Sequence, residues 1–374
     1  MSRLIIKIGT NLLTKEDNTQ NTVFMEKIVR EIAELSRKGH EIVLVTSGAV
    51  ACGRSIIQFE KEKKDIPVKQ VLAAVGQGVL MHEYCRLFAK HQLKVAQVLL
   101  TNLDFSHRKN FLNTRNIVSR LLNLRVIPIV NENDVTAYDE IQFGDNDNLS
   151  ARLSAMIDAD MLILLTDVDG LYTEDPATSP HAKILSKVPK ITEAIKKMAG
   201  KKINKKSCGG MVSKIAAAEY ATQSGVDTLM VSGREENVLC RLMIQKESLG
   251  TFFPATCAKG ENKKRWMKPQ IVKDAWIEID AGAVSAMVSK GASLLPKGVV
   301  SVQGDFKRGD IVNVKGHDGE IVAYGLVNYS AKDTNRIKGQ HSKEIARLLD
   351  GQFEPEIMQR DNVVMGYGVC LKVI

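Results

Sequence analysis

The sequence predicts an α/β protein in two parts: a mostly parallel sheet sandwiched by helices, followed by a small β-barrel-like domain. Three observations support this fold class. Apolar, strand-like runs alternate with helical segments over roughly the first 250 residues. Beyond residue 268 the pattern changes to short strands separated by glycines. The chain has 374 residues, which is enough for about two domains.

Six short runs rich in isoleucine, valine and leucine predict the strands of the first part, because such runs are typical of buried parallel strands. They span residues 4–8, 41–45, 95–100, 126–130, 160–165 and 226–231. Lys7 interrupts the first run. A lysine on a buried strand must either reach an anion or extend its side chain to water, and the pattern leaves both open.

Segments with apolar residues three or four positions apart predict the helices, as at Ile28, Ile32 and Leu35. They span residues 25–37, 68–90, 108–123, 149–157 and 215–224. The second helix contains Gly76 and Gly78, and each glycine weakens an exposed helix by about 1 kcal/mol. Close helix packing and approach of the backbone to a ligand would each explain these glycines.

The composition excludes several classes of protein. Hydrophobic residues make up 44% and charged residues 25%, as in ordinary globular proteins. The net charge of +9 is compatible with anionic substrates but is too diffuse to prove a partner. The six cysteines include no C-x-x-C pair, which indicates reduced thiols. The N-terminus has no signal-peptide pattern and no run approaches roughly 18 apolar residues, so we expect a cytoplasmic protein without membrane association.

The stretch at residues 131–148 reads NENDVTAYDEIQFGDNDN and directly follows the strand at 126–130. So many short acids and amides cannot lie in an apolar core, because each buried one needs a partner. At the carboxyl end of a strand they stand where α/β proteins bind ligands. A long solvated loop is the alternative, but GDNDN holds more acids and amides than a turn requires.

Other strands also end in polar residues. Gly9 and Thr10 follow the first strand. Ser47 follows the second at a helix start, whose N–H groups either hold a carboxylate or phosphate or are simply capped. Asp167 and Asp169 follow the fifth, and either contact a nucleotide or cap the next turn. Right-handed crossovers place four strand ends on one edge of the sheet, which favours a shared binding site. These ends are at Lys7, Ser47, Asn131 and Asp167.

The segment at residues 208–214 reads CGGMVSK and opens the last helix of the first part. Paired glycines before a helix allow backbone N–H groups to approach a phosphate chain. Lys214 lies within the first turns, where it could touch a terminal phosphate. The segment is not a Walker A motif, because no G-x-x-x-x-G-K-[ST] occurs in the sequence.

The second part begins after a charged break at residues 261–268. Short strands are predicted at 276–279, 298–302, 310–314 and 320–324, with a helix at 281–290. Their glycine-separated spacing is that of a small barrel. The module is basic but has no concentrated arginine patch.

These motifs together carry a resemblance to a known family. The sequence resembles the glutamate 5-kinases of the amino-acid kinase superfamily in the order of IIKIGT, VTSGAVACG, LAAVGQG, VIPIVNEND, FGDNDNLSA, LLTDVDGLYT and CGGMVSK. The second part resembles a PUA domain in GASLLPKGV, VQGDFKRGD and AYGLVNYS. The resemblance implies an amino-acid kinase domain at 1–258, a linker at 259–272 and a PUA domain at 273–352. Residues 353–374 would form a C-terminal tail of unknown role.

The resemblance also implies the reaction. The γ-carboxylate of L-glutamate would take the γ-phosphoryl group of ATP, giving L-glutamyl 5-phosphate in the first step of proline biosynthesis. Mg²⁺ would be carried mainly by the ATP phosphates, without a metal site of the protein itself. Lys7 and Lys214 would neutralise charge on the transferring group, and Asp147 would organise the two lysines.

Further site residues are carried over from the family in the same way. Residues expected to bind glutamate are Ser47, Asn131, Asp134, Asp145 and Asn146, with Asp134 as the ammonium acceptor. Residues expected to contact the nucleotide, besides the two lysines, are Gly9, Thr10, Thr166, Asp167, Cys208, Gly209, Gly210, Met211, Val212 and Ser213. Cys208 departs from the family, which usually has threonine there, so a hydroxyl contact at this position is in doubt.

The resemblance implies partners and leaves two alternatives. The implied partners are a second copy of the chain in a dimer or tetramer, proline as a feedback inhibitor and a glutamyl-phosphate reductase. One alternative keeps the fold and changes the acceptor to an acetylglutamate-like compound. The other makes the PUA-like module an RNA binder, but it has few aromatic residues placed for stacking, so we do not expect nucleic acid as the main partner.

Overall fold

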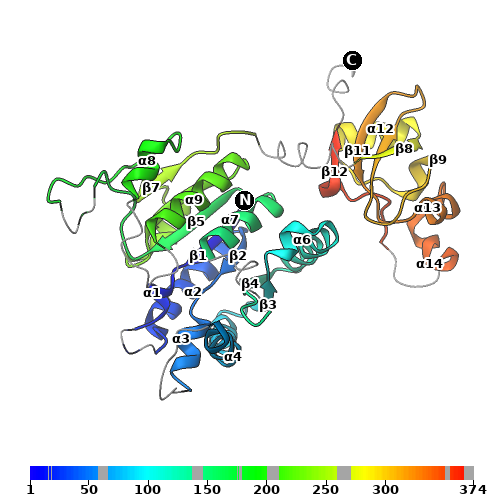
Figure 1. The fold of residues 1–374 in the computed structure, drawn as a ribbon. Coiled ribbons are helices and arrows are strands. Elements are labelled where there is room, and N and C mark those ends of the chain that lie inside the picture. Colours follow the sequence, from blue (N-terminus) through cyan, green and yellow to red (C-terminus); the bar gives the residue numbers. More distant parts are fainter. Residues whose placement is uncertain are drawn as a thin grey trace. The chain divides into compact units, whose positions relative to one another are not determined.

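The computed structural model describes residues 1–15, 17, 19–57, 66–136, 146–174, 176, 179–199, 210–258, 271–349 and 354–365 (Figure 1). The chain divides into two compact units, Met1–Gly260 and Glu261–Ile374. Within the described ranges, the first unit contains a seven-stranded sheet and the second a five-stranded sheet. The predicted two-part fold class is therefore confirmed, whereas the limits assigned to the individual domains remain predictions.

The strands of the first sheet lie in the order β3-β4-β2-β1-β5-β6-β7. Their bounds are β1 (Arg3–Ile8), β2 (Glu41–Val45), β3 (Lys94–Leu100), β4 (Val126–Glu132), β5 (Met161–Thr166), β6 (Asp227–Ser232) and β7 (Thr251–Phe253). Neighbouring strands are parallel except for β6 and β7, which are antiparallel. All six predicted strands are present, and β1 lies in the middle of the sheet between β2 and β5.

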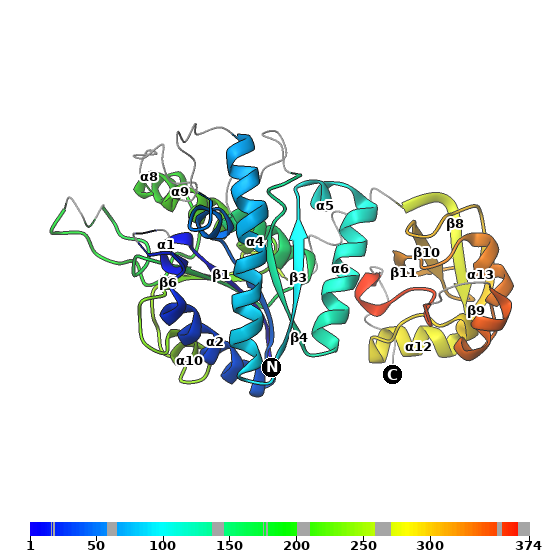
Figure 2. The same cartoon turned by 90° about the horizontal axis from the view of Figure 1, so that it is seen from below.

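Helices cover both faces of this sheet. Their bounds are α1 (Thr10–Leu13), α2 (Thr22–Arg37), α3 (Ala49–Arg54), α4 (Ile66–Ala89), α5 (Leu103–Ser106), α6 (Arg108–Asn123), α7 (Asn146–Met156), α8 (Glu193–Met198), α9 (Met211–Gln223) and α10 (Val238–Met243). Residues of α2, α4 and α10 pack in one core cluster, and residues of α6, α7 and α9 pack in another. Figure 2 shows α4 and α6 on opposite sides of β3 and β4. None of the helices in the described ranges has the length and apolarity needed to span a bilayer.

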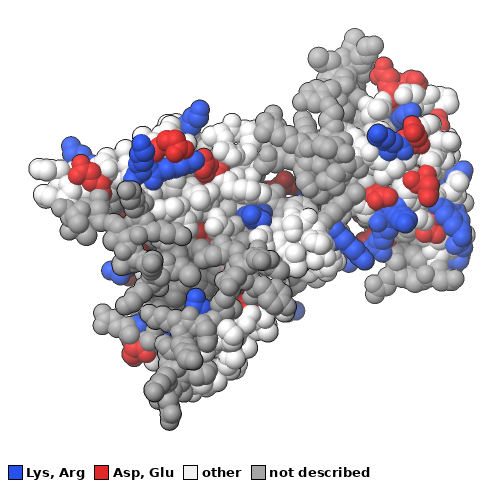
Figure 3. All heavy atoms as spheres, in the orientation of Figure 1, with Lys and Arg blue, Asp and Glu red and all other residues white. Residues whose placement is uncertain are grey.

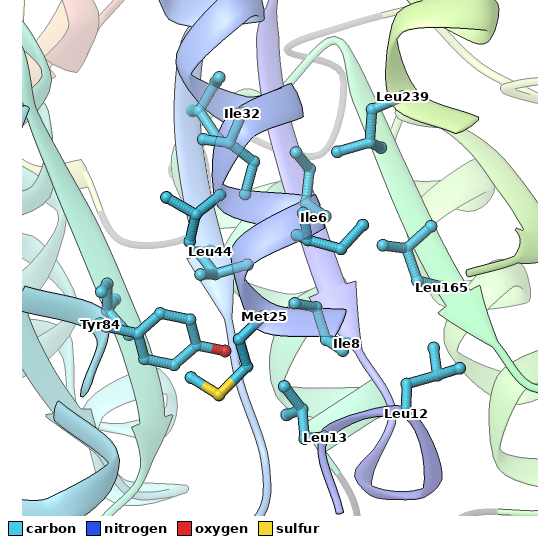
Figure 4. Close-up of a cluster of buried hydrophobic side chains, with 14 of the residues drawn as sticks. Ile6, Ile8, Leu12, Leu13, Met25, Ile32, Leu44, Tyr84, Leu165 and Leu239 are labelled. Carbon is cyan, nitrogen blue, oxygen red and sulfur yellow. The ribbon is translucent and has the colours of Figure 1, made fainter. Parts of the chain in front are cut away.

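Because side chains alternate along β1, the positions of its isoleucines show on which face of the sheet Lys7 lies. Successive residues of a strand face opposite sides of the sheet. Ile6 and Ile8 belong to the cluster formed with α2 and α4, which Figure 4 shows around Met25 and Tyr84. Ile5 belongs to the cluster on the opposite face, with α7 and α9. Lys7 therefore projects toward α7 and α9, and this direction brings it to the site described below.

The second unit contains the strands β8 (Ile271–Ile279), β9 (Val299–Gln303), β10 (Ile311–Lys315), β11 (Ile321–Leu326) and β12 (Val363–Met365). Its helices are α12 (Ala281–Lys290), α13 (Ala331–Ile337) and α14 (Ile345–Leu348), with short 3₁₀ turns at Pro296–Gly298, Ser342–Glu344 and Arg360–Asn362. The four predicted strands and the predicted helix are present. Basic and acidic side chains are interspersed on the face of this unit visible in Figure 3.

Part of the predicted C-terminal tail has a structural role that the sequence did not indicate. Strand β12 pairs antiparallel with β11, and Met358 bridges to Leu294. Ile357 and Met358 are fully buried in the core of the second unit. Residues 354–365 are therefore part of the folded unit, although a three-residue strand is too short to be recognised by its pattern.

Glycines allow α3 and α4 to pack backbone against backbone. A Cβ at Gly76 of α4 would lie 1.9 Å from the carbonyl oxygen of Ala49 in α3, and a Cβ at Gly53 of α3 would lie 2.0 Å from that of Leu72 in α4. No side chain fits at either position. At Gly78 a Cβ would meet nothing within 4 Å. Of the two explanations left open by the sequence, close helix packing accounts for Gly76.

This packing predicts opposite effects for two neighbouring substitutions. Gly76→Ala forces α3 and α4 apart and should lower the free energy of unfolding by about 1–3 kcal/mol. Gly78→Ala, the matched control, adds a methyl group to open space and should stabilise the helix by about 0.5–1 kcal/mol. Urea unfolding followed by circular dichroism measures both. A Gly76→Ala protein as stable as the wild type would contradict the packing argument.

Candidate functional site

The centre of the site is a carboxylate shared by two lysines (Asp147, Lys7 and Lys214). Asp147 Oδ1 lies 2.6 Å from Lys7 Nζ, and Asp147 Oδ2 lies 3.2 Å from Lys214 Nζ. All three are buried, with exposed fractions of 0% for Asp147, 3% for Lys7 and 8% for Lys214. Burying a charged group costs free energy unless the charge is paired. The carboxylate of Asp147 therefore offsets the cost of burying the two ammonium groups. The prediction that the two lysines meet is therefore confirmed, while their part in catalysis remains a prediction.

Three elements from distant parts of the chain bring these groups together. Lys7 comes from the central strand β1, Asp147 from the first turn of α7, and Lys214 from the first turn of α9. A carboxylate in the first turn of a helix is stabilised by the helix dipole, which suits Asp147. The sequence left two explanations open for Lys7: contact with an anion or extension to water. The structure shows contact with an anion, the carboxylate of Asp147.

The start of α9 adds a second contact to the same carboxylate. Ser213 Oγ lies 3.2 Å from Asp147 Oδ2 and 2.8 Å from the carbonyl oxygen of Gly210. Gly210 is the N-cap of α9 and no side chain caps the helix there. Met211 is half-buried and Val212 is exposed. Of the residues expected to contact the nucleotide here, Cys208 and Gly209 lie outside the described residues.

Asparagine side chains build the neighbouring part of the site. Asn146 Nδ2 lies 2.7 Å from the carbonyl oxygen of Thr46 and 2.9 Å from both Ser47 Oγ and Asn131 Oδ1, so its two hydrogens are shared among three acceptors. Ser47 does not cap α3, whose N-cap is Gly48. The ends of β2 and β4 and the start of α7 are thus joined by hydrogen bonds, as expected from strand ends that meet at one edge of the sheet.

Asp134, the predicted acceptor of the ammonium group, lies just after the end of β4 and is half-buried. Burial raises the pKa of its carboxyl group to about 6, and nearby Lys69 opposes part of this rise. Asp145, which was also expected to shape the substrate pocket, lies outside the described residues.

The residues expected to contact the nucleotide on the other side of β1 are also close together. Gly9 N donates to the carbonyl oxygen of Leu165 at 3.2 Å, which joins the end of β1 to the end of β5. Asp167 accepts hydrogen bonds from Asn11 Nδ2 at 2.8 Å and from Thr166 Oγ1 at 3.2 Å. Burial opposes ionisation of Asp167, but these hydrogen bonds hold its pKa below the usual value. Thr10 is exposed beside them.

Asp169 belongs to the turn rather than to this group. Its carboxylate accepts from the hydroxyl group of Tyr172, three residues further along the same turn. The structure therefore supports the turn-forming alternative for Asp169.

Sequence reasoning missed four residues of the site: Asn11, Thr46, Gln77 and Tyr84. Tyr84 is fully buried in α4 and its hydroxyl group lies 2.9 Å from Thr46 Oγ1. Gln77, also in α4, accepts from Asn131 Nδ2 at 2.8 Å. The sequence indicates only that Gln77 and Tyr84 are polar residues in an otherwise apolar helix. It does not indicate which residues they contact.

A magnesium ion of the protein's own is not supported by the donor groups present. Nowhere in the described ranges do three His, Cys, Asp or Glu side chains gather closely enough to hold a metal ion. Both oxygens of Asp147 already pair with lysines, so this carboxylate would have to give up a lysine to become a ligand. Phosphate oxygens are among the preferred ligands of Mg²⁺, and an ion that arrives bound to the nucleotide remains a prediction.

Comparison with known families agrees with this fold and site. The model of the amino acid kinase family matches residues 2–232, and the PUA domain model matches residues 275–349. The chain therefore consists of an amino acid kinase domain followed by a PUA domain. Among solved structures, the UMP kinase from Bacillus anthracis covers 68% of this chain and 97% of its own at 16% identity, with a TM-score of 0.49, so the finer assignment rests on sequence relatives.

Those relatives align over nearly the whole chain. The glutamate 5-kinase of Dehalococcoides mccartyi is 44% identical over 366 residues, which cover 97% of this chain and 98% of that one. Those of Carboxydothermus hydrogenoformans and Herpetosiphon aurantiacus are 44% and 41% identical, over 97% of this chain and 97% and 98% of theirs. This chain belongs to the glutamate 5-kinase family, as its motifs predicted.

Proposed function

We propose that this protein transfers the γ-phosphoryl group of ATP to the γ-carboxylate of L-glutamate, the first step of proline biosynthesis. The observation that carries the proposal is the pair of buried lysines held on Asp147 at the carboxyl edge of the sheet. The names of its relatives supply the acceptor, since 44% identity extends over nearly the full length of both chains.

The chemistry requires little of the protein beyond position and charge. A carboxylate is already a nucleophile at neutral pH, so no base has to remove a proton. A γ-carboxylate oxygen forms a bond to the γ-phosphorus, the bond from that phosphorus to the bridging oxygen breaks, and ADP leaves with the electron pair. Negative charge spreads over the transferring group, and ammonium groups fixed in advance stabilise it at low reorganisation cost.

Lys7 and Lys214 suit this task because they approach from different elements and share one carboxylate. In this proposal they contact the terminal phosphates, while Asp147 holds both ammonium groups in position. When Mg²⁺ is bound to the ATP phosphates, it supplies further charge neutralisation. No protein ligand for the ion is proposed.

The remaining predicted contacts fall on either side of the lysines. Gly9, Thr10, Thr166 and Asp167 lie together at the ends of β1 and β5, which supports a nucleotide on that side. The start of α9 would add backbone N–H groups to the phosphates. On the other side, Ser47, Asn131 and Asn146 would bind glutamate, with Asp134 as the acceptor of its ammonium group.

Further partners follow from the resemblance alone. We propose a homo-oligomer, feedback inhibition by proline, transfer of the product to a glutamyl-phosphate reductase and a cytoplasmic location. The acyl phosphate is a reactive mixed anhydride, so a reaction that consumes it promptly is chemically reasonable.

The acceptor is tested by ATP-dependent acyl phosphate formation with a panel of acceptors, trapped as the hydroxamate with hydroxylamine. We expect glutamate to be the best substrate, ahead of aspartate and N-acetylglutamate. A chain that phosphorylates N-acetylglutamate or a phosphorylated compound in preference to glutamate would refute the proposed acceptor. Trapping without ATP provides the background.

The raised pKa of Asp134 predicts a pH dependence of glutamate binding. Only the ionised carboxylate can pair with an ammonium group, and burial keeps its pKa at about 6 in the free protein. The KM for glutamate should therefore rise as pH falls through 6, approaching tenfold per pH unit below it. The KM for ATP should not follow this titration, and Asp134→Asn should abolish it at a uniformly high KM. A glutamate KM that is flat between pH 5 and 7.5 in the wild type would contradict Asp134 as the ammonium acceptor.

A further inference from the structure

Helix α4 contributes to the site a side chain for which the sequence predicted no role, although it lies within the LAAVGQG motif. Gln77 Oε1 accepts from Asn131 Nδ2 at 2.8 Å. Its position along the sheet is set by Gly76, whose backbone lies against Ala49 and Gly53 of α3. This close approach of the two backbones sets how near α4 lies to α3, and in this arrangement Gln77 lies beside Asn131.

Two backbone groups determine how the asparagine amides are turned. The amide N–H of Glu132 can only donate, and it donates to Asn131 Oδ1 at 2.9 Å. The carbonyl oxygen of Thr46 can only accept, so Asn146 must turn Nδ2 toward it. With Oδ1 of Asn131 also accepting from Asn146, its Nδ2 points away from both groups, and Gln77 provides the acceptor that it needs.

The three amides form a chain of hydrogen bonds in which Asn146 donates to Asn131 and Asn131 donates to Gln77. The oxygen of Asn146 remains as an acceptor at the other end of this chain. Asn146 Oδ1 is buried and has no hydrogen-bond partner among the described residues. A buried acceptor without a partner is rare in folded proteins and usually marks a place where a water or ligand donates. An ammonium group offers three donors and a positive charge, whereas an N-acylated amine offers one donor and no charge.

We propose that Gln77 is a positioning residue that makes the site select a free α-ammonium group over an N-acylated one. Together with the N–H group of Glu132, it holds the Asn131 amide with its oxygen toward Asn146, and this supports the orientation of Asn146 in which Oδ1 can accept from a substrate. The inference rests on the proposed function, because it assigns one N–H donor of the ammonium group of glutamate to this oxygen, in addition to the proposed contact of that group with Asp134.

The test compares two substitutions of nearly equal size. Gln77→Met removes the acceptor and should raise the KM for glutamate roughly tenfold, with kcat and the KM for ATP within about threefold of the wild type. The preference for glutamate over N-acetylglutamate in kcat/KM should fall by a similar factor. Gln77→Glu keeps an acceptor oxygen and should retain a glutamate KM within about threefold of the wild type.

A double-mutant cycle separates positioning from a general loss of structure. In an Asn146→Ala background, Gln77→Met should raise the glutamate KM no further, because the group through which it acts is gone. An equal tenfold rise in both backgrounds, or no rise in either, would overturn the inference. Should Gln77→Met fail to fold, a tenfold rise in Gln77→Glu would overturn it instead. If the wild type does not phosphorylate glutamate, the proposed function itself fails. That result concerns the wild type, so it can be told apart from the outcomes for the Gln77 variants.

Discussion

The site depends on one buried carboxylate that holds two ammonium groups in place. Asp147 is fully buried, and its two oxygens contact Lys7 and Lys214 from opposite ends of the first unit's sequence. Without the carboxylate, two like charges would be buried close together, and each would repel the other. The fold places the carboxylate at the start of α7, next to the central strand β1 that carries Lys7. The order of the strands therefore determines which charged groups meet in the site.

The sheet and the meeting of its strand ends could be predicted because they follow from local patterns and from general rules of topology. The apolar run at residues 4–8 predicts a buried strand and makes Lys7 unusual within it. Parallel strands joined by right-handed crossovers end at one edge, so Ser47, Asn131 and Asp167 had to lie near Lys7. These rules alone do not predict that Lys7 and Lys214 lie close together. That prediction came from the order of motifs shared with a known family.

The contribution of α4 could not be predicted, because it depends on contacts between residues far apart in the sequence. Gln77 and Tyr84 reach Asn131 and Thr46 because α4 packs against α3 at Gly76 and against the core of the sheet. Strands β7 and β12 escaped prediction for a different reason, since three residues cannot display a period. Residues Asp145, Cys208 and Gly209 remain predictions, because they lie outside the described residues.

The central claim is that Lys7, Asp147 and Lys214 act as one unit on the transferring phosphoryl group. Single-turnover rates of glutamate phosphorylation in Lys7→Met, Lys214→Met and the double variant test it most directly. The account predicts that each single variant loses at least about a hundredfold in rate and that the double variant is little slower than the slower single one. A single variant with the wild-type rate, or two losses that simply multiply in the double variant, would contradict it.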